Sequence, residues 1–209
     1  MRLEKASYKA AKFACLNYHY AKRIPASVNV SYAVFNDDNE FCGVIMYGYP
    51  ATPALNKQFN LKHGELLELR RVALNSKQKI TSQALAISMR LVKKDCPTVK
   101  MLISYSDKGQ DHYGTIYQAT NWIFLEESES SGYEYYVNGK WMHSRHGKGE
   151  VKRKLPGKRK YVYPLEKKLL IEYKLKHKPY PKKLSGVVES NANSQLDVEC
   201  VTTTLTPQV

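Results

Sequence analysis

The chain has 209 residues, 43% of them hydrophobic, which is long and apolar enough for one folded domain with a sizeable core. No apolar run approaches the roughly 20 residues that span a bilayer, so a transmembrane helix is excluded. The basic first residues lack the apolar core of a signal peptide, so we expect them to belong to the mature protein. The formal net charge is +14.

The first half of the chain predicts one helix and three strands. The helix covers residues 6–16. The β-branched and aromatic residues of 28–35 and 41–49 predict two antiparallel strands joined by the polar turn NDDNE. Residues 50–64 show little periodicity and are expected to form a loop, and 65–74 predicts a third strand.

A second helix and a central strand follow. Residues 83–96 place apolar side chains on one helical face, and Thr81 or Ser82 is expected to cap the helix start. The short apolar run 100–105 predicts a strand buried on both faces. A helical crossover joins it to the preceding strand, so the two strands are expected to pair in parallel. A ligand is then expected beyond their carboxyl ends.

The remaining elements complete an α+β prediction. Residues 112–121 predict a short helix, 122–127 a strand, and 133–142 a hairpin whose Asn-Gly dipeptide favours a type I′ turn. The predicted fold is a three-layer arrangement: a mixed, mostly antiparallel sheet with one parallel strand pair and helices on both faces. The last residues, 185–209, are polar without a helical period and are expected to be disordered.

The positive charge is concentrated in one segment. Residues 140–183 contain sixteen Lys and Arg against three acidic residues, a net +13. Aromatic residues are interspersed among them: Trp141, Tyr161, Tyr163, Tyr173 and Tyr180. This pattern is typical of a surface that follows a nucleic-acid backbone and stacks on bases, and a solvated lysine-rich face is the alternative. We therefore predict a catalytic core in residues 1–139, a basic, aromatic-rich, nucleic-acid-contacting extension packed on it in 140–184, and the tail in 185–209.

Two polar clusters could supply chemistry near the carboxyl ends of the parallel strands. The motif NYHYAKRIP places His19 and Tyr20 after the first helix, where they suit acid–base chemistry and substrate positioning or simply form a surface turn. The segment NSKQKITS precedes the second helix and, with Ser82, could bind an anion or act as a plain cap. GxGxxG and Walker motifs are absent, which argues against a Rossmann dehydrogenase and a P-loop nucleotidase.

The third cluster is SYSDKGQDHYGTIYQATNW, residues 104–122. Asp107 comes just past the end of the central strand, where a polar side chain can point into a cleft. Tyr113 and Tyr117 share one face of the short helix. Asp111 and Trp122 are interpreted as structural residues, whereas Asp107 and Tyr117 suit a structural and a functional role equally well.

The sequence gives only weak support for other kinds of functional site. The four cysteines are scattered without a CxxC pair, which excludes zinc-finger spacing and favours reduced thiols in a cytoplasm. No GxSxG elbow accompanies the serines of the 104–122 cluster. His143 and His146 lack a neighbouring carboxylate or thiol that would complete a metal site.

Three of these elements together resemble the Mom family of phage DNA-modification proteins, within the GNAT-like (N-acetyltransferase-like) superfamily. They are HY-x-K…P (His19, Tyr20, Lys22, Pro25), EL…RRV (Glu68 to Val72), and SYSD…Q-x-H-x-GTIYQATNW. The resemblance covers roughly residues 10–180. It implies an enzyme that converts adenine in phage DNA to N6-carbamoylmethyl-adenine and so protects the genome from host restriction.

The resemblance also implies a site. Its catalytic residues would be His19, Tyr20, Ser82, Asp107 and Tyr117, with Asp107 or His19 as the base. The residues expected to contact double-stranded DNA are Lys22, Arg23, Arg71, Lys152, Arg153, Lys154, Lys158, Arg159, Lys160 and Tyr161. The protein would act in the cytoplasm of the bacterial host without a membrane partner, and a homodimer stays open.

The donor of the modifying group is not predicted. The superfamily implies an acyl-coenzyme A donor, but its Gly-rich turn is replaced here by QKITSQA. The family resemblance also implies iron, and the residues themselves leave the metal unknown. Two other functions remain: a GNAT-type N-acyltransferase acting on a protein or small amine, and a nucleic-acid-binding protein without catalytic activity.

Overall fold

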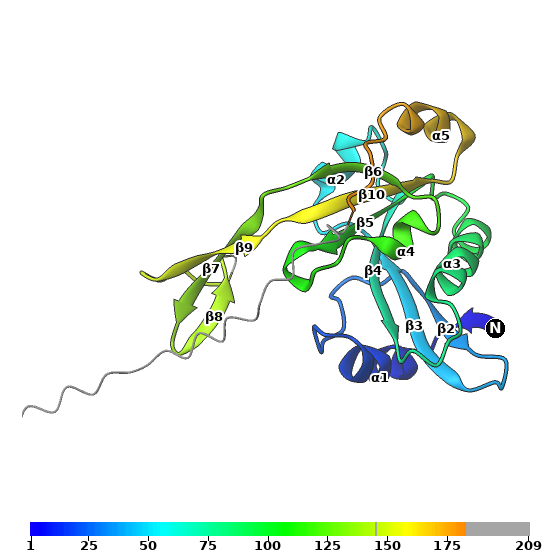
Figure 1. Cartoon of the computed structure of the whole chain (residues 1–209), viewed down its shortest axis with the longest axis horizontal. Helices are drawn as coiled ribbons and strands as arrows, with labels where there is room; N and C mark the ends of the chain where they lie inside the picture. Colours follow the sequence, from blue (N-terminus) through cyan, green and yellow to red (C-terminus); the bar gives the residue numbers. More distant parts are fainter. Residues whose placement is uncertain (145, 183–209) are drawn as a thin grey trace, which may run out of the picture.

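The computed structural model describes residues 1–144 and 146–182. Its centre is a seven-stranded sheet in the order β1-β2-β3-β4-β5-β10-β6 (Figure 1). Only β4 and β5 pair in parallel among the described strands. The strands of this sheet are β1 (Arg2–Lys5), β2 (Val30–Phe35), β3 (Phe41–Gly48), β4 (Leu66–Leu74), β5 (Met101–Asp107), β6 (Ile123–Glu127) and β10 (Lys158–Pro164).

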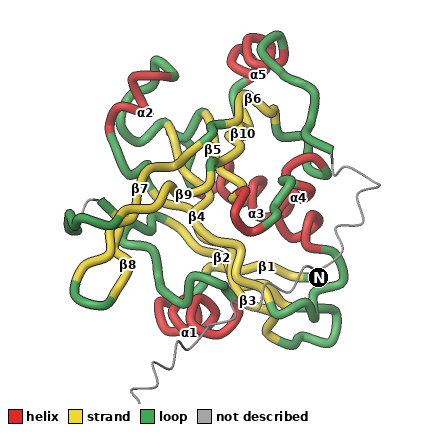
Figure 2. The backbone as a smooth tube through the Cα atoms, turned by 60° about the vertical axis from the view of Figure 1, so that its left-hand side comes forward, coloured by secondary structure: helices red, strands yellow, loops and turns green. Residues whose placement is uncertain are grey.

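Helices cover both faces of the sheet (Figure 2). One face packs against α1 (Tyr8–Tyr18), α2 (Pro53–Gln58) and α5 (Lys167–Lys174). The other packs against α3 (Thr81–Asp95) and α4 (Thr115–Gln118), and a short 3-10 helix, η1 (Lys108–Gln110), follows β5. The alternation of β5 explains its apolar sequence, because Leu102 enters the α3 side while Met101 and Ile103 enter the other. The predicted α+β class, a mixed sheet with one parallel strand pair and helices on both faces, is confirmed.

The parallel strands separate along their length. β4 and β5 are paired only where Leu66, Leu67 and Glu68 face Met101, Leu102 and Ile103. Beyond that point β4 remains paired with β3, and β5 remains paired with β10. The carboxyl halves of β4 and β5 therefore open a wedge in the middle of the sheet.

The basic segment contributes a strand to the sheet itself. β10 lies between β5 and β6 and is antiparallel to both. The expected boundary at residue 139 therefore cuts through one continuous sheet, and residues 158–164 are part of the core rather than packed on it. The tail expected to be disordered, 185–209, lies outside the described residues.

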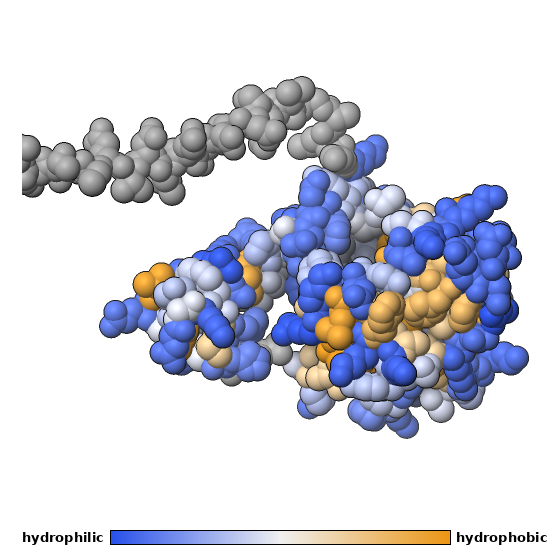
Figure 3. Space-filling view, turned by 90° about the horizontal axis from the view of Figure 1, so that it is seen from below, coloured by the Kyte–Doolittle hydropathy of each residue, from blue (hydrophilic) through white to orange (hydrophobic). Residues whose placement is uncertain are grey.

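A three-stranded arm extends from the sheet. It consists of β7 (Ser130–Val137), β8 (Lys140–His143) and β9 (Lys152–Pro156) in the order β8-β7-β9. Figure 1 shows the arm standing away from the helices, and Figure 3 shows it as a separate, mostly hydrophilic lobe. Its hairpin turn has positive φ at Asn138 (50°) and Gly139 (79°), as predicted for a type I′ turn.

Several local expectations were wrong or incomplete. The loop prediction for 50–64 missed α2, which begins at Pro53, and no prediction covered β1, β9, β10 or α5. The cap of α3 is Ile80, without a side-chain hydrogen bond, so neither Thr81 nor Ser82 caps this helix. Within the residues described, no helix has the length and hydropathy needed to cross a bilayer.

Candidate active site

The wedge between β4 and β5 contains a pocket of about 320 Å³. This volume lies at the small end of the roughly 300–1,000 Å³ typical of small-molecule sites. The lining comes from the end of α1, the middle of β4, the end of β5, α4 and the start of β10: Tyr18, His19, Tyr20, Glu68, Leu69, Arg70, Arg71, Val72, Tyr105, Asp107, His112, Ile116, Tyr117 and Lys158. Four of the five predicted catalytic residues therefore meet in one pocket.

His19 ends α1 and contributes a neutral imidazole to the pocket. Its Nδ1 accepts a hydrogen bond from the backbone N–H of Ala21 at 3.0 Å. Burial, and then the positive charge of Arg71, lower the pKa of His19 to about 4. Because Nδ1 uses its lone pair to accept this bond, the proton of the neutral ring sits on Nε2. His19 is thus a hydrogen-bond donor in this arrangement and is poorly suited to act as the base.

Tyr20 stacks on His19 and presents its other side outward. The two ring centroids are 4.3 Å apart with 29° between the planes, and the tyrosine is 55% exposed. The edge of His112 lies against it, with the centroids 6.1 Å apart. Burial, and then the nearby carboxylate of Asp107, raise the pKa of Tyr20. Its hydroxyl therefore stays protonated near neutrality beside Asp107.

Asp107 is held in place by main-chain bonds on both sides. Its Oδ1 accepts from the backbone N–H of Gly109 at 2.9 Å, and its carbonyl oxygen accepts from the N–H of His112 at 3.2 Å. Across the β5–β10 pair it faces Lys158, another pocket residue. In the described part of the chain no ion pair is formed by Asp107. Its second oxygen is therefore available to accept a substrate proton.

Tyr117 reaches the pocket from α4, on the opposite face of the sheet. It is 8% exposed, and its hydroxyl accepts a hydrogen bond from Ser104 Oγ at 2.9 Å. Burial raises the pKa of Tyr117 to about 12. Because Ser104 supplies this bond, the proton of the Tyr117 hydroxyl remains available for a bound molecule. Tyr117 is accordingly a donor rather than a base.

Arg71 is a pocket cation that forms no ion pair among the described residues. Its neighbour Arg70 forms an ion pair with Glu68 at 2.8 Å. Arg71 instead donates from Nη1 to the carbonyl oxygen of Arg70 at 2.7 Å, and its buried Nε has no hydrogen-bond partner within the described residues. Burial lowers the pKa of Arg71, which reflects the cost of holding this charge without a counterion. An anion in the pocket would relieve that cost.

The structure separates some predicted residues from this pocket. Ser82 lines a different cavity of about 560 Å³ between α3, the end of α4 and β10. Lys22 and Arg23 are exposed on the turn that follows the pocket residues of α1, and Lys22 donates to the carbonyl oxygen of Asn17 at 3.2 Å. Lys152, Arg153 and Lys154 lie on β9 of the arm.

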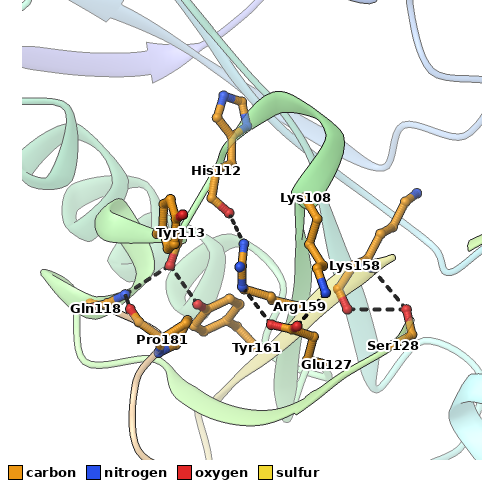
Figure 4. Close-up of polar contacts among 10 residues, drawn as sticks. All are labelled: Lys108, His112, Tyr113, Gln118, Glu127, Ser128, Lys158, Arg159, Tyr161 and Pro181. Carbon is orange, nitrogen blue, oxygen red and sulfur yellow. Dashed lines mark hydrogen bonds and ion pairs between the residues drawn. The ribbon is translucent and has the colours of Figure 1, made fainter. Parts of the chain in front are cut away.

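Two residues expected to contact DNA instead hold the loop of the 104–122 cluster (Figure 4). Arg159 is 8% exposed and donates from Nε to Glu127 at 2.8 Å and from Nη1 to the carbonyl oxygen of His112 at 2.9 Å. Tyr161 is fully buried, and its hydroxyl donates to the carbonyl oxygen of Tyr113 at 2.9 Å. Neither side chain is free for phosphate or base contacts in this structure, and this corrects the sequence prediction.

Lys160 is likewise occupied within the protein. Its side chain is mostly buried, and its ammonium group is paired with Glu126. Sequence reasoning also missed several pocket residues, among them Glu68 and Tyr105. One feature of the sequence could have indicated Glu68. In ELLELRRV this acidic residue lies between leucines and is followed closely by two arginines.

The residues present do not fit an iron site. Across residues 1–144 and 146–182 no group of three or more His, Cys, Asp or Glu could hold a metal ion. The hydrogen bond from Ala21 to Nδ1 also fixes the proton of His19 on Nε2, the nitrogen that a metal would need. We therefore derive no step through a metal.

The turn before α3 does not fit coenzyme A in the usual manner. Gln78 is 7% exposed within this turn and donates to the Thr81 hydroxyl at 2.8 Å. The turn is thus filled by a side chain, where a glycine-rich turn would leave room for backbone N–H groups to approach a pyrophosphate. No step is routed through coenzyme A.

Comparison with known proteins assigns the chain to a family. The family model described as "Mom protein family" matches residues 1–182. The chain belongs to the Mom protein family. It is 27% identical over 147 residues to the methylcarbamoylase mom of Escherichia phage Mu, over 68% of this chain and 60% of that protein. The chain thus aligns with less than two thirds of the length of this curated Mom relative.

Solved structures similar to this Mom-family chain include acetyltransferases. NAA60 of Arabidopsis thaliana in complex with a bisubstrate analogue is 12% identical, with a TM-score of 0.52, over 78% of this chain and 97% of that one. A GNAT family acetyltransferase of Elizabethkingia anophelis with acetyl-CoA bound is 14% identical, with a TM-score of 0.45, over 78% and 97% of the two chains. The likeness to NAA60 concerns the fold alone and agrees with the layers described above.

Proposed function

We propose that this protein modifies adenine in double-stranded DNA and forms N6-carbamoylmethyl-adenine, which protects phage DNA from restriction in the host cytoplasm. The observation that supports this most strongly is the meeting of His19, Tyr20, Asp107 and Tyr117 in one pocket. These are residues that the Mom resemblance assigns to catalysis, and they come from two separate parts of the chain, residues 19–20 and the 104–122 cluster. The activity named for the phage Mu relative, methylcarbamoylase, agrees with this product.

Asp107 is the base of the proposed reaction. The N6 amine of adenine is a poor nucleophile because its lone pair is delocalised into the ring, so removal of a proton must accompany attack. Among the described residues, a hydrogen bond is made to only one side-chain oxygen of Asp107, whereas His19 presents an N–H. The donor is a molecule that bears the carbamoylmethyl group on a leaving atom. The bond from N6 to the methylene carbon forms as the bond to that atom breaks, and the N6 proton passes to Asp107.

The other pocket residues orient the reactants. The hydroxyls of Tyr20 and Tyr117 stay protonated and can donate to the amide oxygen of the transferred group or to a ring nitrogen of the base. Arg71 provides a charge for a phosphate of the substrate strand. Since N6 is occupied in base pairing, adenine must leave the duplex to enter the pocket, at a cost of a few kcal/mol. The exposed ring of Tyr20 offers a surface on which the extruded base can stack.

Restriction digestion tests the proposal with an internal control. Plasmid DNA from cells that express the protein should resist enzymes whose recognition sites contain adenine. Sites built only of G and C should be cut as in DNA from cells without the protein. Equal cutting of both classes of site, with abundant folded protein present, would count against the proposal. An N-acyltransferase would instead leave its product on proteins or small amines.

A further inference from the structure

The two faces of the arm differ in charge. In an antiparallel sheet, residues directly opposite one another project to the same face. The register of β7 with β8 and β9 defines a lysine face, made of Tyr133, Tyr135, Lys140, Met142, Lys152 and Lys154. The opposite tryptophan face includes Glu134, Tyr136, Trp141, His143 and Arg153.

On the tryptophan face, the charge of the arginine is neutralised by a glutamate of the same face. Arg153 donates to Glu134 from Nε at 2.9 Å and from Nη2 at 2.6 Å. Its guanidinium also lies 4.3 Å from the centroid of Trp141, which in turn packs on Tyr136. This face therefore has an arginine but little net positive charge to offer a partner.

The positive charge of the lysine face is largely not neutralised by acidic residues of the described chain. Lys140, Lys152 and Lys154 are exposed. Neither Lys140 nor Lys152 has an acidic partner among residues 1–144 and 146–182. Lys154 lies 3.9 Å from Glu129, whose side chain is 95% exposed, so solvent screens this pair. The Lys152 ammonium lies 5.3 Å from the centroid of Tyr133, which places a cation and an exposed aromatic ring together.

The strand that carries two of these lysines leads directly to the pocket. β9 continues through Gly157 into β10, and Lys158 both begins β10 and lines the pocket opposite Asp107. An extended chain from residue 152 to 158 spans about 20 Å, at about 3.3 Å per residue. That distance is about six base pairs of duplex DNA, at about 3.4 Å each.

We propose that the lysine face of the arm binds the phosphate backbone of double-stranded DNA next to the base that enters the pocket. This inference rests on the proposed function for its substrate. The exposed lysines neutralise phosphates without reading sequence, and the arm holds the duplex alongside the pocket. The tryptophan face takes no part in this contact.

Duplex binding across a salt series tests the inference with a matched control on the other face. The full chain with Lys140, Lys152 and Lys154 replaced by Gln is compared with Arg153→Gln, by fluorescence anisotropy with a labelled duplex. Each lost phosphate contact should reduce the slope of log affinity against log salt by about 0.9. We expect the triple variant to lose about two to three units of slope and Arg153→Gln to lose almost none. An unchanged slope in the triple variant, or an equal loss in both variants, overturns the inference.

Three further measurements keep the test decisive. Thermal melts establish that the variants fold, and Lys152→Gln alone replaces the triple variant if that variant does not. Anionic phosphatidylglycerol vesicles serve as a second polyanion, and a triple variant that loses vesicle binding but keeps duplex binding overturns the inference. The adenine adduct in cellular DNA is scored separately. Absence of the adduct with the wild-type protein rejects the proposed function, while the salt series alone decides whether the arm binds DNA.

Discussion

The guanidinium of Arg159 on β10 donates a hydrogen bond to the main-chain carbonyl of His112, 2.9 Å away. The same group pairs with Glu127 on β6. A residue of the basic segment thus fixes the loop that brings Asp107 and His112 to the pocket. The loop of the 104–122 cluster and the basic segment form one structural unit, although their sequences suggested a catalytic element and a separate DNA-contacting extension.

Replacement of Arg159 by Met should therefore loosen the pocket and destabilise the fold. Hydrogen bonds to charged groups contribute about 1.5–3 kcal/mol each, and Glu127 retains Lys108 as a partner, so we expect a loss of about 2 kcal/mol in urea denaturation. Activity on DNA should fall as well. The matched control is Arg153→Met, which removes an exposed arginine of the arm and should cost less than about 1 kcal/mol. Equal costs in the two variants would contradict the anchoring role.

Tyr117→Phe should separate the catalytic role of the hydroxyl from its structural role. The variant removes the proton donor proposed for the pocket, and loss of such a group lowers rates by about 10²–10⁴-fold. Ser104→Ala removes the same hydrogen bond from its other end but leaves the tyrosine hydroxyl in place. Modification assays should show a much larger loss for Tyr117→Phe, whereas urea denaturation should show a similar loss of stability in both variants. If the two variants lost the same activity, the Tyr117 hydroxyl would have a structural role and no catalytic role.

The pKa of His19 predicts a stability change in mild acid. The folded protein holds this pKa at about 4, below the usual value of 6.5, so the unfolded chain binds more protons between these two pH values. The contribution of His19 to the free energy of unfolding should therefore fall as pH drops from about 6.5 to about 4 and stay constant above 6.5. Urea denaturation at pH 7 and pH 4.5 should show a smaller acid loss for His19→Gln than for the wild type. An identical loss would mean that His19 titrates normally in the folded protein.

Substitution of two glycines that have similar positive φ would measure how tightly the catalytic loop packs. Gly114 and Gly139 have φ of 72° and 79°, where a side chain is strained by about 1–2 kcal/mol. A Cβ on Gly114 would lie 2.4 Å from the Tyr161 hydroxyl, whereas one on Gly139 would meet nothing within 4 Å. Gly139→Ala should cost about 1 kcal/mol. Gly114→Ala should cost about 3 kcal/mol by thermal denaturation, because overpacking adds to the strain.

Much of this architecture could be predicted from local sequence patterns. The apolar strand before Ser104, the amphipathic α3 and the Asn-Gly turn follow from side-chain periodicity and turn chemistry. The parallel pairing of β4 and β5 follows from their helical crossover. The role of β10 could not be predicted by counting charge, because the strand KRKYVYP places Tyr161 and Val162 in the core. Its residues Arg159 and Lys160 pair with Glu127 and Glu126 on the neighbouring strand.

The pocket was partly predictable for the same reason. Asp107 and Tyr117 lie close in sequence and could be linked by the chemistry of one segment. Arg71 and Glu68 enter the pocket only because β4 and β5 separate after three paired residues, which is a property of the whole sheet. Ser82 is a residue that was predicted to belong to the site but does not. The sequence at the start of α3 suggested a site, and the structure shows that Ser82 lines another cavity.

The most direct test of adenine modification in this pocket is mass spectrometry of nucleosides from the DNA of cells that express the wild-type protein or Asp107→Asn. Asparagine keeps an oxygen that can accept from Gly109, so the loop should be preserved while the base is removed. At equal levels of soluble protein we expect deoxyadenosine bearing a carbamoylmethyl group with the wild type, and at least a roughly 100-fold lower yield with the variant. Absence of the adduct in wild-type DNA, or equal adduct in both samples, would contradict this account.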